Sequence, residues 1–419
     1  MRIENIRTFA FRSLLVAGVA VLGACDTDVT NPGPVQDEFL NDPQSHEALV
    51  NGMGRQVAEA LNWIGYTSAA VAREVHPSGS TGSFGITIRW QRGELDRLDD
   101  DLNTHWNQGQ QARWLAENGT ARMEEVGPAS QELLAQAYLW TGYANRLLGE
   151  NMCEAVIDGG SPQLSTEFLN RAEQAFTQAM SLGTGDIATA ATAGRAAVRV
   201  HLGKWSEAVT DAAQVPDDFE YGIPYFNTGE EALLNRIQWA SNGVPYRAHT
   251  QWNTKYEQYY LDTGDPRVAW MDNGGEEGDA AIDCCGKVPW NQQLKYPDPA
   301  DDIRLSSGAE MRLVEAEKLL IDGDWNGAMT KINALRSAAG VAAATAASSD
   351  EAWAMLKRER GIVLWLEGRR LGDLRRWSEN GTPGALHPLE VVGEASHLVR
   401  QDLCFPIPPS EQETNPNVS

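Results

Sequence analysis

The chain has 419 residues, a hydrophobic fraction of 42% and a formal net charge of −24. That length allows one large domain or two ordinary ones, and the composition is typical of a globular protein with an apolar core. The 58 acidic residues outnumber 34 Lys and Arg, which argues against a nucleic-acid-binding surface because phosphate recognition needs clustered cations. Such acidity is common in proteins that stay soluble in an exposed compartment.

The N-terminus predicts export and lipid attachment. Three arginines precede an apolar run at 14–22, which is too short to span a bilayer. The run ends in Leu-Gly-Ala-Cys, and small residues before a cysteine are typical of a lipoprotein signal peptide. We therefore predict a signal peptide at 1–24, lipidation of Cys25 and a polar tether over 25–44.

Four further cysteines can form disulfides in an exported protein. They are Cys153, Cys284, Cys285 and Cys404, and four cysteines allow three pairings. A bond between the adjacent Cys284 and Cys285 would close a small strained ring, so we expect Cys153 and Cys404 each to pair with one of these two. A metal site is disfavoured because the usual C-x-x-C spacing and nearby histidines are missing.

Helical periodicity begins near Ser45. The pattern breaks at 76–94, where 76–82 is a loop by its Pro, Gly and Ser content and 86–90 predicts a short strand. A long helix follows from Trp106 to Val126. We expect Trp106, Trp114 and Met123 on or near its buried side.

The rest of the chain repeats a two-helix pattern. Helices are predicted at 131–148, 168–182, 187–202, 205–215, 308–321 and 325–338. Two of these pairs share small residues in the first helix, Gly-x-Trp in the turn and Ala on the second helix. This pattern is tetratricopeptide-like, because small residues let two antiparallel helices approach closely and the aromatic fills the gap.

The sequence therefore predicts an all-α fold, a tetratricopeptide-like helical-repeat scaffold with a loop-rich, aromatic-rich binding lobe. The scaffold is expected mainly at 105–215 and 308–377, where 351–377 forms a last helix. The lobe is expected mainly at 60–100 and 216–307, because the second segment is rich in Pro, Gly and aromatic residues. The proline-rich tail at 405–409 is predicted to be extended and not helical.

Several motifs together resemble one family, the SusD/RagB outer-membrane nutrient-binding lipoproteins. In chain order they are the lipobox at Cys25, D-P-R at 265–267, a strand-like entry and L-x-x-A-E helix at 302–317, I-N-x-x-R at 332–336, R-E-R through E-G-x-R-x-x-D-L-R-R-W at 358–377, and F-P-I-P with N-P-N at 405–417. Each motif is weak alone, but their ordered combination is specific. Gly361 and Gly372 depart from the pattern, which indicates a divergent member.

The resemblance implies a SusD-like domain over 45–419 that binds nutrients at the outer membrane, lipid-anchored and facing the cell exterior. It implies docking as a lid on a TonB-dependent, SusC-like transport barrel. The ligands of the family are oligosaccharides and sometimes peptides. The sequence does not identify which of these this chain binds.

The charged residues of the last motif are expected to be structural rather than functional. Glu359, Glu367, Arg369, Asp373 and Arg376 have the spacing of ion pairs on helices and at helix ends. The same interpretation applies to the I-N-x-x-R residues, Asn333 and Arg336.

A sugar site needs aromatic faces to stack on the ring and polar side chains for the hydroxyls. Two segments supply this mixture, and the candidate ligand-binding residues are Trp63, Tyr66, Arg73, His76, Trp90, Trp252, Tyr256, Trp270 and Trp290, accompanied by Phe84, Tyr259, Asn253 and Asn291. Core packing is the competing interpretation for each aromatic. The tryptophans of the scaffold are expected in the core: Trp106, Trp140, Trp205, Trp325, Trp353, Trp365 and Trp377.

The sequence contains little that indicates a catalytic site, and we predict that the chain is not an enzyme. It has no G-x-S-x-G, H-E-x-x-H or phosphate-binding loop, although any two carboxylates could meet in the fold for glycoside hydrolysis. No cofactor is predicted. The acidic runs at 96–101 and 272–283 could bind calcium through oxygen ligands, but a solvated charged stretch is the preferred interpretation.

These features predict a glycan- or nutrient-binding surface lipoprotein that captures oligosaccharide and passes it to the transporter. Two alternatives remain, a peptide-binding member of the family and a repeat scaffold that binds only another protein. The aromatic-rich segment between the repeats favours capture of a small ligand, but an aromatic protein interface would have the same composition.

Overall fold

A computed structural model describes residues 37–244 and 246–418. The predicted signal peptide, Cys25 and most of the tether lie outside these residues. Within them, no helix has the length and apolar character needed to cross a membrane.

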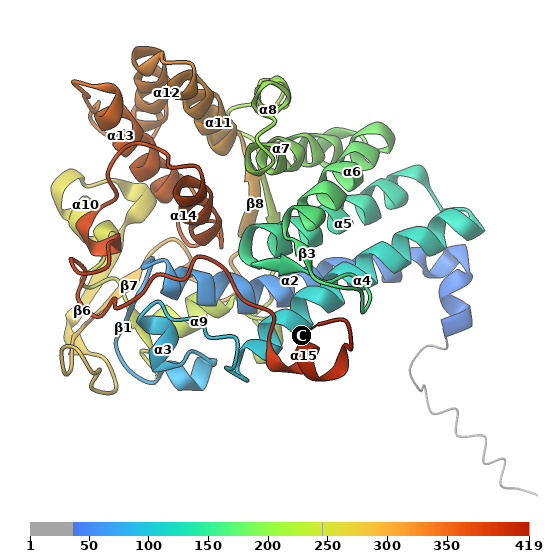
Figure 1. The fold of residues 1–419 in the computed structure, drawn as a ribbon, viewed down its shortest axis with the longest axis horizontal. Helices are drawn as coiled ribbons and strands as arrows, with labels where there is room; N and C mark the ends of the chain where they lie inside the picture. Colours follow the sequence, from blue (N-terminus) through green and yellow to red (C-terminus); the bar gives the residue numbers. More distant parts are fainter. Residues whose placement is uncertain (1–36, 245, 419) are drawn as a thin grey trace, which may run out of the picture.

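Helices make up most of the described chain and stack as antiparallel neighbours (Figure 1). The longer ones are α2 (His46–Val71), α4 (Leu102–Val126), α5 (Gln131–Asn151), α6 (Thr166–Leu182), α7 (Gly185–His201), α8 (Trp205–Ala212), α11 (Gly308–Ile321), α12 (Trp325–Ala338), α13 (Ser349–Val363) and α14 (Arg370–Glu379). Serine side chains cap several of them, as at Ser307, whose hydroxyl accepts a hydrogen bond from Glu310 N at 3.1 Å. The predicted helical-repeat fold is confirmed.

Small residues set the close approach of the helices, as the repeat pattern predicts. A Cβ added to Gly142 on α5 or to Gly194 on α7 would lie within 2.6 Å of the Phe176 ring on α6. Phe176 is fully buried between its neighbours. Larger residues at these two positions would therefore push the three helices apart.

The two halves of the repeat are continuous in space although about 90 residues separate them in sequence. Buried alanines of α7 and α8 pack against Met311 and Val314 of α11. The intervening segment leaves and rejoins the scaffold through one strand pair, because β4 (Glu220–Ile223) pairs antiparallel with β8 (Ile303–Ser307).

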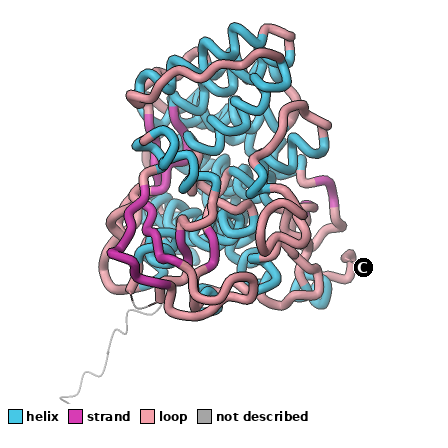
Figure 2. Tube along the Cα trace, turned by 90° about the vertical axis from the view of Figure 1, so that its left-hand side faces the viewer, coloured by secondary structure: helices cyan, strands magenta, loops and turns pink. Residues whose placement is uncertain are grey.

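The remaining elements are short. They are β1 (His76–Pro77), α3 (Ile88–Gln91), β2 (Glu154–Ala155), β3 (Gln163–Leu164), α9 (Arg236–Asn242), β5 (His249–Thr250), α10 (Lys255–Thr263), β6 (Trp270–Glu277), β7 (Pro289–Gln293) and α15 (Pro409–Thr414), with 3-10 turns at Asp37–Asn41, Pro43–Ser45, Thr81–Phe84, Glu231–Leu233, Pro266–Val268 and Pro388–Glu390. Among them, α3 and α9 lie against α2. Figure 2 shows most of the strands along one side of the molecule. One apolar core runs through both parts.

Local predictions failed at four places. Residues 86–90 are not a strand, because Thr87 caps the short helix α3 instead. The predicted last helix at 351–377 is two helices, because the backbone between α13 and α14 is left-handed at Leu366 (φ 59°) and Gly368 (φ 70°). The tail is not wholly extended, since Pro409 begins α15 as its first residue, where a missing N–H costs nothing. Trp114 is not buried but 52% exposed.

The charged residues of the C-terminal motif form buried ion pairs, which confirms their structural interpretation. Arg369 donates to Glu150 of α5 at 2.7 Å and to Glu310 of α11 at 2.9 Å. Four other arginines also form ion pairs with buried carboxylates: Arg360–Asp373 (2.8 Å), Arg376–Glu317 (2.6 Å), Arg304–Glu367 (2.7 Å) and Arg267–Glu359 (2.6 Å). Asn333 likewise bonds the backbone of Ala344, and Arg336 donates to Ala342 O at 2.8 Å.

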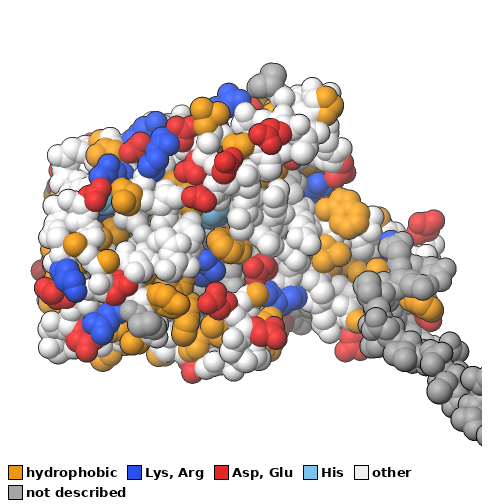
Figure 3. All heavy atoms as spheres, turned by 90° about the horizontal axis from the view of Figure 1, so that it is seen from below, with side chains coloured by type: hydrophobic (Ala, Val, Ile, Leu, Met, Phe, Trp, Pro, Cys, Tyr) orange, Lys and Arg blue, Asp and Glu red, His pale blue; other side chains and the backbone are white. Residues whose placement is uncertain are grey.

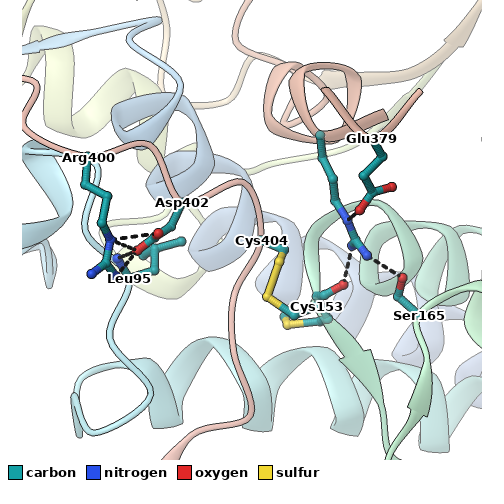
Figure 4. Close-up of a disulfide and its surroundings, with 9 residues drawn as sticks. Leu95, Cys153, Ser165, Glu379, Arg400, Asp402 and Cys404 are labelled. Carbon is teal, nitrogen blue, oxygen red and sulfur yellow. Dashed lines mark hydrogen bonds and ion pairs between the residues drawn. A yellow bond between two sulfur atoms is a disulfide. The ribbon is translucent and has the colours of Figure 1, made fainter. Parts of the chain in front are cut away.

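The predicted disulfide pairing was wrong. Cys153 bonds to Cys404 with a Cα–Cα distance of 5.0 Å, and Cys284 bonds to its neighbour Cys285. Backbone hydrogen bonds on both sides hold the first pair together, from Cys153 N to Phe405 O (2.9 Å) and from Phe405 N to Asn151 O (2.8 Å). The adjacent cysteines lie instead in the turn between β6 and β7. Figure 4 shows the Cys153–Cys404 bond joining the C-terminal segment to the end of α5.

We expect the two disulfides to differ in their effect on stability. Replacing Cys153 and Cys404 by Ser should lower the free energy of unfolding by about 2–4 kcal/mol, because this bond closes a 251-residue loop in the unfolded chain. Replacing Cys284 and Cys285 should change it by less than about 1 kcal/mol, since a link between neighbours removes little freedom. Chemical denaturation of both double variants measures this, and equal losses would contradict the pairing.

Candidate functional site

Most of the predicted ligand-binding residues lie in the core. Six have 2% exposure or less: Tyr66, Arg73, His76, Trp90, Tyr256 and Trp290. The indole N–H groups of the two tryptophans are engaged internally, from Trp90 Nε1 to Asp99 (3.0 Å) and from Trp290 Nε1 to Ser241 O (2.9 Å). For these six residues the structure thus supports core packing, the competing interpretation of the sequence analysis. Of the accompanying residues, Phe84, Tyr259 and Asn291 are buried as well.

Three of the predicted residues remain partly exposed: Trp63, Trp252 and Trp270. Arg236 covers the Trp63 ring at 3.9 Å from its centroid. Trp270 packs edge-on against Tyr260 of α10, with ring centroids 6.1 Å apart. Only Trp252 and Trp270 therefore border the surface around α10.

The structure joins the two predicted segments and adds a third that the sequence analysis missed. β1 pairs antiparallel with β5, and His76 contacts Trp252 edge-to-face at 5.1 Å between ring centroids. Asn253 then donates to Ser396 Oγ at 2.6 Å. Nothing in the composition of 391–400 indicates this position, because the contact depends on how the C-terminal segment crosses the molecule.

Three histidines and Arg73 gather beneath this junction. His76 and His249 are fully buried, and His397 is half-buried with its ring 6.3 Å from that of His76. Burial lowers the pKa of His249 to about 3, with Arg73 adding repulsion, and it lowers the pKa of Arg73 to about 10. The histidines are therefore neutral at physiological pH.

A cavity lies on the other side of α10. We call it the α10 pocket. It has a volume of about 290 Å³ and opens between α10, α13 and the segment 385–390. The residues that line it are Lys255, Tyr256, Gln258, Tyr259, Asp262, Ala354, Met355, Lys357, Arg358, Ile362, Arg370, Ala385, Leu386, His387, Pro388 and Glu390.

The α10 pocket combines an apolar wall with a polar rim. Met355, Leu386 and Pro388 form the apolar side together with the tyrosines of α10. Tyr259 is held in place by the Arg358 guanidinium, 3.8 Å from its ring centroid. On the rim, Gln258 and Asp262 are exposed on successive turns of α10. Such a site offers dispersion contacts to a ring and hydrogen bonds to hydroxyl groups.

The base of the α10 pocket is a closed set of ion pairs. Glu390 accepts hydrogen bonds from Lys255 (2.7 Å) and Arg370 (2.8 Å). Burial, with the charge of Arg370, lowers the pKa of Lys255 to about 8. Lys357 has a similar pKa of about 8, again through burial, and donates to two backbone carbonyls. Because each of these cations already has fixed partners, the arrangement is suited to shaping the pocket.

In residues 37–244 and 246–418, no cluster of His, Cys, Asp or Glu has the arrangement of a metal site. The acidic run at 96–101 contacts its own surroundings, with Asp96 bound by Arg89 at 2.8 Å. In the second run Asp283 forms an ion pair with Arg92. The preferred interpretation of both runs as solvated charged stretches stays a prediction.

Comparison with known proteins identifies relatives of the sequence and of the fold. Residues 303–419 match the model of the SusD family. The fold is similar to a SusD superfamily protein from Bacteroides vulgatus, with a TM-score of 0.65 and 16% identity over 91% of this chain and 99% of that one. No curated protein matches the sequence.

Two further structures have names that state a ligand. A SusD-like carbohydrate binding protein from Bacteroides vulgatus has a TM-score of 0.66 and 14% identity, over 90% of this chain and 97% of that one. A laminarin binding SusD-like protein has a TM-score of 0.62 and 14% identity, over 90% of this chain and 98% of that one. At these identities, the likeness shows the fold.

The buried histidines predict a loss of stability in acid. Their pKa is near 6.5 in the unfolded chain and about 3 for His105 and His249 in the fold, so the unfolded state binds protons first as the pH falls. Each of these two histidines should lower the free energy of unfolding by about 1.4 kcal/mol at pH 5.5 relative to neutral pH. This loss of stability should grow as the pH falls from 6.5 toward 3.

Denaturation of the His249→Gln variant at pH 7.5 and 5.5 measures this contribution. Gln keeps an acceptor for the Tyr66 hydroxyl, which lies 2.8 Å from His249 Nδ1, but it cannot titrate. The variant should lose less stability than the parent between the two pH values. The half-buried His387, replaced by Gln, serves as the control with a smaller change. An unchanged pH slope in His249→Gln would contradict the prediction.

Proposed function

We infer that the protein belongs to the SusD family, from the match of residues 303–419 and the fold of the described chain. On this premise we propose that it captures oligosaccharide and passes it to a TonB-dependent, SusC-like transporter. It does so without catalysis. The observation that carries the ligand part is the α10 pocket, which joins an apolar wall to exposed hydrogen-bonding side chains. Two fold relatives named as carbohydrate- or laminarin-binding support a glycan as the ligand class.

We propose that the rim of the α10 pocket selects the sugar and that the wall supplies most of the affinity. The carboxylate of Asp262 and the amide of Gln258 can bind hydroxyls from the same helix face, one turn apart. Leu386 and Pro388 bound the opposite wall. The partly exposed Trp252 and Trp270, on the other side of α10, provide stacking surfaces for further units of a longer chain.

The cellular setting is part of the same proposal. A signal peptide at 1–24 and a lipidated Cys25 with a tether over 25–44 would anchor the SusD-like domain of 45–419 to the outer membrane, facing the exterior. The support is the lipobox in the sequence together with the family assignment. Within the domain, 60–100 and 216–307 supply the binding lobe.

A peptide is the second candidate ligand. Arg358 and Asp262 present opposite charges on the same pocket, and such a pair can also bind a peptide's carboxylate and amine groups. A repeat scaffold that binds only a protein partner is the third possibility, in which the pocket holds no small ligand.

The pocket is tested by calorimetry on the chain from residue 26, with panels of oligosaccharides and short peptides. We expect saturable binding of a glycan, weakened about tenfold in Asp262→Ala, because a lost hydrogen bond to a charged group costs about 1.5–3 kcal/mol. Asp322→Ala, at the exposed end of α11, is the matched control and should bind as the parent does. Glycan binding that Asp262→Ala leaves intact would place the site elsewhere, and binding of peptides alone would establish the second candidate.

The anchoring and transport steps are tested in cells that carry the complete gene. The parent chain should incorporate labelled fatty acid, fractionate with the outer membrane and co-purify with a β-barrel protein of the transporter class. Cys25→Ser should lose the label and leave the membrane fraction, while Cys284→Ser, as a control cysteine substitution, should retain both. A parent chain without label, or one that purifies without a barrel, contradicts this part of the proposal.

A further inference from the structure

Trp114 is a large aromatic residue left open on the scaffold. It lies on α4, and 52% of its surface is exposed. Figure 1 shows α4 and α10 at well-separated places in the molecule. The exposed indole is therefore not part of the α10 pocket or of the Trp252–Trp270 surface.

The indole borders a shallow hollow with a volume of about 300 Å³. Gln110 and Gln111 come from the preceding turn of α4, and Asp158 and Gly159 come from the loop opposite. The Gln111 side chain is exposed and makes no hydrogen bond within the described chain, and the Asp158 side chain is 61% exposed with one carboxylate oxygen left open. An apolar ring thus stands beside an available amide and an available carboxylate.

The walls of the hollow are fixed before any ligand arrives. Arg113, only 3% exposed, donates to Asp158 at 2.7 Å, to Gln110 at 2.9 Å and to Glu117 at 2.6 Å. Gln110 in turn donates to Val156 O at 2.9 Å. The loop at 156–160 is thereby tied to α4 by one buried guanidinium and one amide.

The C-terminus fixes the same loop from the other side. Asn415 donates to Gly160 O at 3.0 Å, and Asn417 donates to Gly159 O at 2.8 Å. The Cys153–Cys404 disulfide holds the chain just before the loop. A site that is rigid in advance loses little conformational entropy on binding.

We propose that this hollow is a second carbohydrate-binding site, which takes one or two units of a neutral sugar stacked on Trp114. The choice of a glycan rests on the proposed function, whereas the site itself rests on the geometry of α4 and the loop at 156–160. The volume is at the lower end for small-molecule sites. Gln111 and Asp158 lie where they can bind ring hydroxyls.

The charge of the hollow favours neutral over acidic sugars. Arg113 is the cation that lines it, and its guanidinium is buried and committed to three partners. The carboxylates of Asp158 and Glu411 face the hollow as well. A uronate or sulfated sugar would therefore meet repulsion, while neutral hydroxyls can donate to the carboxylates.

The volume of the hollow suits a small ligand better than a broad protein contact. On the face drawn in Figure 3, hydrophobic side chains lie singly or in groups, with acidic and basic side chains between them. Stable protein interfaces need a larger continuous core. Trp114 instead forms one wall of a hollow that has about the size of a sugar unit.

The test is calorimetry and tryptophan fluorescence on the chain from residue 26, with laminarin oligosaccharides, maltooligosaccharides and oligogalacturonate as probes. We expect two sites per chain for a neutral oligosaccharide, the Trp114 site being lost in Trp114→Ala and the α10 pocket being weakened about tenfold in Asp262→Ala. Gln111→Ala should weaken only the Trp114 site, by about tenfold. Trp325→Phe, at a scaffold turn outside the hollow, is the control. Oligogalacturonate should bind the Trp114 site at least about tenfold more weakly than the neutral oligosaccharide does.

The outcomes separate this site from the proposed function. Glycan binding with one site per chain, unaffected by Trp114→Ala, overturns the second site and leaves the first. Binding of no glycan at either place overturns both. Trp114→Ala that keeps all glycan binding but no longer co-purifies with the transporter shows a protein contact instead, which also overturns the inference.

Discussion

The guanidinium of Arg369 holds together the parts of the molecule that the sequence separates most. It lies 5% exposed between Glu150, near the end of α5 in the first repeat half, and Glu310, at the start of the second half. The two carboxylates compensate the charge that burial would otherwise disfavour, and the pKa of Arg369 is raised above its ordinary value. Without the cation, two buried carboxylates would lose their closest partner, and breaking a buried ion pair costs about 3–5 kcal/mol in comparable cases. The scaffold is continuous because this triad fixes α5 and α11 relative to α14.

The position of α14 in turn shapes the α10 pocket. Arg370 follows Arg369 directly and pairs with Glu390, which also binds Lys255 of α10. One short helix therefore connects the scaffold to the two elements that form opposite sides of the pocket. A buried network of this kind contributes little net stability over an apolar core. Its physical effect is to give each charged side chain a single set of partners, which fixes the separation between α10 and the segment 385–390.

The lobe has few regular elements, and for this reason most of its aromatic residues are buried in the core. Short strands and turns supply little apolar surface of their own, so side chains such as Trp90 and Trp290 fill the space against α2. Three residues other than glycine adopt left-handed backbone where the lobe segments meet, namely Arg73 (φ 61°), Asn253 (φ 57°) and His397 (φ 71°). Such strain persists only where the surroundings determine the conformation. Of the predicted ligand-binding aromatic residues, the lobe therefore exposes only a few side chains around α10.

The sequence by itself determined the fold class, the helical repeats and the structural role of the C-terminal charged motif. Periodicity and small residues specify these locally, and Gly308–Ile321 and Trp325–Ala338 have the predicted bounds. Only the tertiary structure decided which aromatics are exposed, as Trp114 against Trp90 shows, and which cysteines pair. Both depend on contacts between segments more than a hundred residues apart, such as Cys153 with Cys404 and Asn253 with Ser396. Residue type and local spacing do not encode such contacts, because they arise when the C-terminal segment crosses the folded scaffold.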